Sequence, residues 1–288
     1  GYFVRAARIA SAEAMGQVNR FGYFVLYPAF LYTLISRAGI ASVDSGRFLF
    51  GILLGVAALM LATLGLRFVF RGDGPAFTSL FQGAVRWNGF IVLAAAPSLY
   101  GQAGLDLIGL AFGPLVLTIN IISVLVLTRW GAAPAASPRA VFDQIIANPL
   151  ILACAAGLAA NFAGLHELGP ATDALALLGP AAMPVALVCV GAGLDFNALR
   201  AAPSKLATAA LLKLAIAPAL VWSAVSWCGA SPLAAAVAAG LGATPTAAAA
   251  YTLARELGGD ARLMAAIITA TTALSFLSLP IVLILTRP

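Results

Sequence analysis

The residues of this chain that could do chemistry gather around prolines that lie inside long apolar runs. Pro97 lies in one such run and Pro245 in another, and each has polar neighbours. Interior proline removes a backbone hydrogen bond and kinks or breaks a helix. The second half of a broken helix begins with free N–H groups and a partial positive charge, which bind carboxylates and other anions. The candidate donors beside these prolines are the hydroxyl groups of Ser98, Tyr100, Thr244 and Thr246.

Two basic residues, Arg86 and Lys213, also fall inside apolar runs. Charged residues within a membrane span are functional candidates by default, although long cationic side chains also snorkel towards the interface. Both interpretations remain open here. No Asp or Glu falls in the middle of a run, which argues against a carboxylate proton relay and against an acidic cation site. We therefore expect an anionic ligand, with Arg86 and Lys213 among the substrate-binding candidates.

Polar residues on neighbouring runs widen this set. Asn148 directly precedes Pro149, so it is either a helix N-cap or part of the site. Asn120 and Asn161 are candidates too, with interhelical hydrogen bonding as the alternative. Cys154, Cys189 and Cys228 lie in apolar runs without a metal-binding spacing. We expect no metal and no cofactor.

The elements that position these residues follow from composition. The 288 residues are 62% hydrophobic and only 9% charged, whereas a soluble domain carries about a quarter charged residues. A water-soluble globular enzyme is therefore excluded. Most runs are long enough for a helix of about 20 residues across a membrane, and none alternates like a barrel strand. Nine complete runs follow a stub at 1–4, the expected tail of a largely missing first span: 21–36, 48–66, 76–100, 105–128, 142–165, 172–195, 206–228, 231–254 and 263–286.

The net charge of +6 does not indicate nucleic-acid binding, because the basic residues are scattered singly and form no patch. Their distribution among the linkers instead indicates the membrane topology. One set of alternate linkers carries most of them: Arg5, Arg8, Arg20, Arg67, Arg71, Arg129, Arg139, Arg200, Lys205, Arg255 and Arg262. The opposite set carries Arg37, Arg47 and Arg287. The positive-inside rule then places the first set in the cytoplasm. We expect a multi-pass protein of the bacterial inner (plasma) membrane, with the N-terminus outside and the lipid bilayer as a partner.

The prolines also suggest two related halves. Pro28 and Pro184 are about half a chain apart, as are Pro97 and Pro245, and all four are predicted helix breaks. Ordinary transmembrane kinks are the alternative. Because each half holds an odd number of spans, the second half must be inverted relative to the first. We expect the first repeat at 1–129, a cytoplasmic linker at 130–140 and the second repeat at 141–288. Paired interrupted spans in inverted halves mark a transporter site.

Several stretches carry a family resemblance. They are GYFVRAARIASAEAMGQVNRFGYFVLYPAFL (1–31), RWNGFIVLAAAP (86–97), NPLILACAAGLAANFAG (148–164), AAMPVALVCVGAGL (181–194), KLAIAPALVW (213–222), GATPTAAAAYTLARELGGD (242–260) and TTALSFLSLPI (271–281). In their order and spacing the chain resembles the auxin efflux carrier family, especially its bacterial, malonate-transporter-like members, within the bile acid and auxin transporter-type superfamily.

The resemblance implies an all-α fold of ten spans in two inverted five-helix repeats. Spans one, two, six and seven would form a scaffold, and spans four and nine would break and cross beside the substrate. Pro97 and Pro245 match these crossovers. Asn88 resembles the polar residue before the fourth-span break, but it lies more than two helical turns ahead of Pro97.

We therefore predict a secondary transporter that moves a small organic carboxylate anion by alternating access. An anion channel and a transporter-derived sensor are the alternatives, although the linkers are too short for a sensor's output domain. An intramembrane enzyme is disfavoured, because the sequence contains neither His-Glu-x-x-His nor Gly-x-Ser-x-Gly and no paired mid-span aspartates. A homodimer is expected as an assembly, and nucleic acid is not expected as a partner.

Overall fold

Helices form the regular structure in the part of the chain that the structure describes. This computed structural model describes residues 1–39, 43–69, 72–132, 139, 143, 146–165, 169–200 and 202–287. Within these ranges there is no strand, only an isolated antiparallel bridge between Trp87 and Thr246. The prediction of an all-α chain is therefore confirmed. Arg71 and most of the linker 130–140 lie outside the described residues.

Each apolar run predicted from the sequence contains helix in its described part. The first half contains α1 (Tyr2–Ala6), α2 (Ala12–Phe21), the π-helix η1 (Gly22–Leu26), α3 (Tyr27–Ser36), α4 (Val43–Gly65), the 3₁₀ turn η2 (Leu66–Phe68), α5 (Gly74–Val85) and α6 (Gly89–Trp130). The second half begins with α8 (Pro149–Phe162), α9 (Pro170–Leu178), η3 (Gly179–Ala181), α10 (Ala182–Ala192) and η4 (Phe196–Arg200). It continues with α11 (Pro203–Leu211), the π-helix η5 (Leu212–Ile216), α12 (Ala217–Trp227), α13 (Pro232–Ala243), α14 (Ala249–Glu256) and α15 (Ala261–Leu285).

Five helical stretches are long and apolar enough to cross a membrane. They are 44–68, 89–130, 170–192, 203–227 and 261–285, and the apolar helices α8 and α13 are shorter. The long helix α6 consists of two helices that join at Gly101, whose φ of 63° is favourable only for glycine. The turn between the expected fourth and fifth spans therefore lies at Gly101. These helices support a multi-pass membrane protein.

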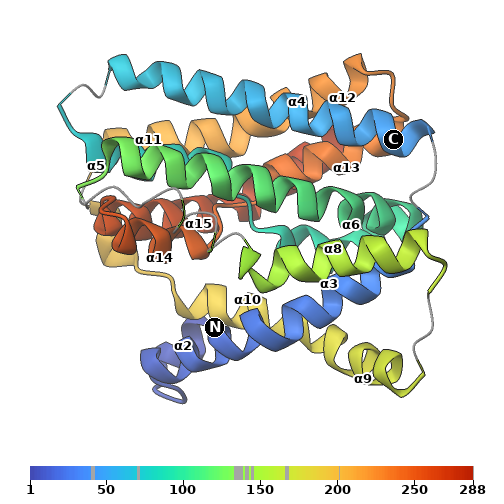
Figure 1. The fold of residues 1–288 in the computed structure, drawn as a ribbon. Helices are drawn as coiled ribbons and strands as arrows, with labels where there is room; N and C mark the ends of the chain where they lie inside the picture. Colours follow the sequence, from blue (N-terminus) through green and yellow to red (C-terminus); the bar gives the residue numbers. More distant parts are fainter. Residues whose placement is uncertain are drawn as a thin grey trace.

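The helices form two groups (Figure 1). One contains α2, α3, α8, α9 and α10, where α3 packs on α8 and α9 and α2 packs on α10. The other contains α4, α5, α6 and α11 to α15, where α12 packs between α4 and α13. Glycine permits the closest approach, because a Cβ on Gly51 or Gly55 of α4 would lie 2.7 or 2.6 Å from the Cα of Val225 or Val221. The first group contains the spans that the resemblance assigns to a scaffold.

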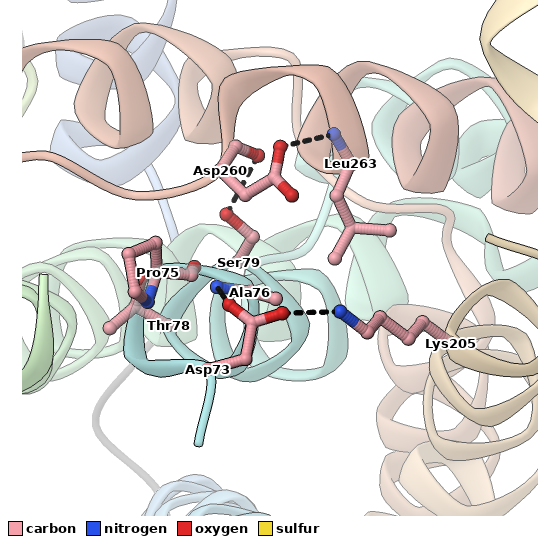
Figure 2. A network of polar contacts seen from close by, with 8 residues as sticks. All are labelled: Asp73, Pro75, Ala76, Thr78, Ser79, Lys205, Asp260 and Leu263. Atoms are coloured by element: carbon pink, nitrogen blue, oxygen red, sulfur yellow. Dashed lines mark hydrogen bonds and ion pairs between the residues drawn. The ribbon is translucent and has the colours of Figure 1, made fainter. Parts of the chain in front are cut away.

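At one end of the second group, a polar network joins the starts of α5, α11 and α15 (Figure 2). Asp73 caps α5 by accepting the Ala76 N–H at 3.0 Å, and Lys205 Nζ lies 2.5 Å from its other carboxylate oxygen. Asp260 caps α15, and its carbonyl oxygen accepts the Ser79 hydroxyl at 2.9 Å. The linkers before these three helices, all assigned to the same side from their charges, therefore meet at one end.

The linkers of the opposite set meet in the same way. Ser231 caps α13 by accepting the Ala234 N–H with its hydroxyl oxygen. The Asp44 carboxylate of α4 accepts both the N–H and the hydroxyl of Ser231 at 2.7 Å, which joins α13 to α4. Asp106 accepts the Gly39 N–H at 3.2 Å. Both arrangements agree with spans that alternate in direction. Which end faces the cytoplasm stays a prediction.

The predicted proline breaks need correction. Pro97 lies inside α6 on an exposed face, and the helix continues to Gly101, so a break at Pro97 is wrong. Pro28 follows the π-helix η1, and Pro184 lies in the first turn of α10 after a 3₁₀ turn. These two prolines accompany distorted turns in continuous spans, because a missing N–H is accommodated by local π or 3₁₀ geometry. Pro245 does lie in an interruption, between α13 and α14.

Candidate functional site

The site is built where two interrupted helices meet. The chain leaves helical geometry at residues 86–88, between α5 and α6, and again between α13 and α14. These two segments pair in antiparallel fashion: the Asn88 N–H donates to the Pro245 carbonyl at 2.9 Å, and the Ala247 N–H donates to the Arg86 carbonyl at 3.4 Å. The pairing satisfies backbone groups that would otherwise be unpaired within a membrane.

Two buried threonines support the ends of the helices that stop here. Thr246 Oγ1 donates to the Gly83 carbonyl in the last turn of α5 at 2.6 Å. Thr244 Oγ1 donates to the Leu241 carbonyl in the last turn of α13 at 2.8 Å. Both side chains have no exposed surface. Their hydroxyl groups therefore satisfy helix C-terminal carbonyls and do not face a cavity.

A cavity of about 190 Å³ lies against the paired segments and between the two helix groups. From the first group, α2, η1, α3, α8 and α10 contribute to its wall. From the second group, residues 86–90, α6 and residues 247–249 contribute. Its polar side chains are Asn19, Tyr23, Tyr27, Arg86, Asn88, Asn120 and Asn148. Among the described residues that line it, none is Asp or Glu.

Unpaired hydrogen-bond donors give this cavity its chemistry. Arg86 has buried Nε and Nη1 atoms with no hydrogen-bond partner in the protein. The Asn88 side chain is 4% exposed, and its Nδ2 also has no partner. A buried donor without a partner costs about 1–3 kcal/mol, and more when it is charged. These groups are therefore suited to a ligand that accepts hydrogen bonds.

Two helix N-termini add to the positive character of the cavity. Helix α6 begins at Gly89 and α14 at Ala249, and the first residues of both line the wall. Asn88 occupies the N-cap position of α6 but makes no capping hydrogen bond with its side chain. Each terminus carries free N–H groups and about half a positive charge. Guanidinium, amide and helix ends thus converge on one small volume.

The structure brings together only part of the predicted set. Arg86 and Asn88 share the cavity wall, and Asn120 and Asn148 join them. Asn148 is also the N-cap of α8, accepting the Leu150 N–H at 3.0 Å, as one of its two interpretations predicts, and a role in binding stays a prediction. Pro97 and Ser98 are exposed on α6 and do not line the cavity.

The remaining candidates have structural contacts. The Tyr100 hydroxyl donates to the Ala236 carbonyl at 3.1 Å, which joins α6 to α13. Lys213 is buried in η5, away from this wall. Asn161 Nδ2 lies 2.8–3.1 Å from three carbonyl oxygens at the end of α3, as expected for interhelical hydrogen bonding.

Sequence reasoning found Asn148 but missed the rest of the wall contributed by the first group. Asn19, Tyr23 and Tyr27 all line the cavity. Their spacing of four residues places them on one helical face, and this pattern of polar tips was visible in the sequence. Among the described residues, no cluster of three or more His, Cys, Asp or Glu side chains suits a metal ion.

Comparisons with known proteins agree with a membrane carrier. Residues 144–283, from before α8 to near the end of α15, match the family described as "Membrane transport protein". A protein of Rhizobium meliloti (strain 1021) named "Putative malonate transporter" is 26% identical over 282 residues, which cover 96% of this chain and 88% of the relative. The matches agree with the resemblance recognised in the sequence: the second half of this multi-pass chain is similar to the membrane transport protein family, and nearly the whole chain is similar to a putative malonate transporter.

Proposed function

We propose that this protein is a secondary transporter that carries a small organic carboxylate anion across the membrane by alternating access. The observation that carries the proposal is the Arg86 guanidinium, whose buried Nε and Nη1 atoms are unpaired at a cavity between two helix groups. A carboxylate would accept these donors in charge-assisted hydrogen bonds, which are roughly twice as strong as neutral ones.

The size and charge of the cavity support this class of substrate. A cavity of about 150 Å³ is large enough to bind benzene, so about 190 Å³ suits an acid of a few carbons. The two helix N-termini and Asn88 favour an anion, and no acidic side chain among the described wall residues opposes it. Malonate, which the name of the relative specifies, is the first substrate to test.

The position of the cavity supports alternating access. Its wall is shared by the two helix groups, so movement of one group past the other would change which side the anion can reach. At the boundary, the rings of Tyr27 and Phe90 pack with centroids 4.4 Å apart, beside Ala182 and Ala186.

The paired interruptions support the remaining parts of the proposal. We assign 1–129 and 141–288 to inverted repeats whose fourth and ninth spans cross at the bridge between Trp87 and Thr246. The crossover of the first repeat then lies at 86–88, the position of the Asn88 resemblance. We also propose the inner membrane, an external N-terminus and a homodimeric assembly.

Transport by reconstituted protein tests the proposal. Full-length protein in liposomes should take up labelled malonate, or another acid from a panel of small carboxylates, down an imposed gradient. Arg86→Gln should abolish this uptake, whereas Arg129→Ala, which removes an exposed cation at the end of α6, should preserve it. The absence of both uptake and binding across the whole panel would refute the proposal.

A further inference from the structure

Lys213 is a buried cation that the anion cavity does not use. Its side chain is 1% exposed and lies in the π-helix η5, which precedes Pro218. Its Nζ donates to the Gly242 carbonyl at 3.2 Å. Gly242 belongs to the last turn of α13, the helix that stops at the second interruption.

A second broken helix ends at the same place. Lys213 lines a cavity of about 20 Å³ together with Val85, the last residue of α5, and with Leu241 and Gly242 of α13. The last turn of a helix has unpaired carbonyl oxygens and about half a negative charge. The ammonium thus binds the negative end of α13, and the lysine shares a small cavity with the last residue of α5, whereas Arg86 lies at the cavity where α6 and α14 begin.

No carboxylate in the neighbouring helices balances this ammonium. The elements packed against η5 are α5, α11, α12, α13 and α15. The charged residues within them are Lys205 and Arg262, which are both basic. Helices α4 and α6 also line the cavity beside Lys213, but their carboxylates Asp44 and Asp106 bond to Ser231 and Gly39 instead. Helix carbonyls are therefore the negative groups that Lys213 meets within the described part of the chain.

We propose that the Lys213 ammonium is a covalently attached cation that stabilises the C-terminal end of the broken helix α13 beside that of α5, in the role that a bound coupling cation has at such helix ends in other transporters. Half-helix C-terminal ends and unwound carbonyls are ligands for such ions. With the cation supplied by the chain, anion transport requires no sodium at this position. Lys213 is a positioning residue, since it acts through the interruption and does not touch the substrate cavity.

Chemical rescue tests this assignment. Lys213→Ala removes the ammonium and enlarges the cavity beside it. In choline chloride, we expect this variant to have a lower Tm and malonate uptake reduced about tenfold or more, the effect of losing one hydrogen bond from a charged group. Methylammonium chloride should restore most of both properties, because it places an ammonium back at the carbonyls. Wild-type protein should behave alike in the two salts.

Two variants serve as controls. Lys213→Met keeps the volume of the stem without the charge, so it should be defective in uptake and insensitive to methylammonium. Lys205→Ala removes a lysine that is bonded to Asp73 at the end of the bundle, and its uptake should not respond to methylammonium. If Lys213→Met has the Tm and the uptake of the wild type in choline chloride, the proposal is overturned. This test also holds if Lys213→Ala fails to fold.

The uptake measurements rest on the proposed function, but the Tm measurements do not. If wild-type protein moves no anion and Lys213→Ala still gains thermal stability from methylammonium, the transporter proposal fails and the assignment of Lys213 stands. If uptake is present and no small cation, including sodium, changes the Tm of Lys213→Ala, the assignment of Lys213 fails alone.

Discussion

Replacing Arg86 separates a binding role from a structural role, because its buried donors are unpaired in the structure. Arg86→Gln removes the guanidinium but leaves the Arg86 carbonyl bond to the Ala247 N–H, which involves only the backbone. No side-chain hydrogen bond of Nε or Nη1 is lost, since neither atom has a partner. We therefore expect the Tm of the variant to equal or exceed that of the wild type.

Anion affinity should respond in the opposite direction. Truncating one partner of a buried, hydrogen-bonded charge pair costs about 2–5 kcal/mol. If Arg86→Gln loses about 2–4 kcal/mol of binding free energy, the Kd for malonate should rise about 30- to 1,000-fold, because roughly 1.4 kcal/mol corresponds to a factor of ten.

Thermal shift in detergent, measured with and without malonate, gives both quantities from one sample. Saturating ligand raises the Tm of the wild type by mass action, and this ligand-dependent rise should vanish in Arg86→Gln while the unliganded Tm is kept. Unchanged malonate affinity, or a collapse of the unliganded Tm, would refute the reasoning that assigns Arg86 to the ligand.

Three further predictions concern the contacts that hold the site in place. Gly55→Ala should destabilise the protein by about 1–3 kcal/mol through overpacking, since the new Cβ would lie 2.6 Å from the Cα of Val221. Denaturation in detergent measures this loss of stability. An unchanged stability would mean that α4 and α12 are not packed so closely. Asn161→Leu should cost about 1–3 kcal/mol, because it removes the amide hydrogen bonds from Nδ2 to the carbonyls at the end of α3, and a wild-type Tm would contradict this. The hydrogen bond from Lys205 lowers the pKa of Asp73 below its ordinary 3.8, so the stability from this pair is complete above that pH and is lost as the pH falls through the lower folded-state value. Because the pair is partly exposed, it contributes at most about 1 kcal/mol. In a plot of Tm against pH, Asp73→Asn should reduce the fall in Tm at acid pH. An unchanged fall would exclude the Asp73–Lys205 pair as the source of the acid sensitivity.

Local sequence predicted the spans well because hydrophobicity and helix length act over short stretches. The turn at Gly101 and the interruption at Pro245 both follow from residues with special backbone preferences. The interruption at 86–88 contains no glycine or proline. It forms because its backbone pairs with a segment from the other half of the chain, and this long-range contact leaves no local signal.

The candidate site was predictable to a similar extent. Arg86 stood out as a cation within an apolar run, and it does line the cavity. Thr244 and Thr246 were expected at the second break and lie there, but their hydroxyl groups bond to helix carbonyls, which only the packing of α5 and α13 could reveal. The direction of a small polar side chain depends on tertiary contacts, whereas its position on a span does not.

The bridge between the two interruptions also bears on how the protein is made. Asn88 emerges from the ribosome long before Pro245, so its N–H has no partner while the first half enters the membrane. Residues 86–88 must then be helical or temporarily hydrated, and they reach their final geometry only after α13 and α14 are inserted. The proposed anion site would therefore be incomplete in the isolated first half, and coexpressed halves should recover it only if their assembly restores this pair of backbone segments.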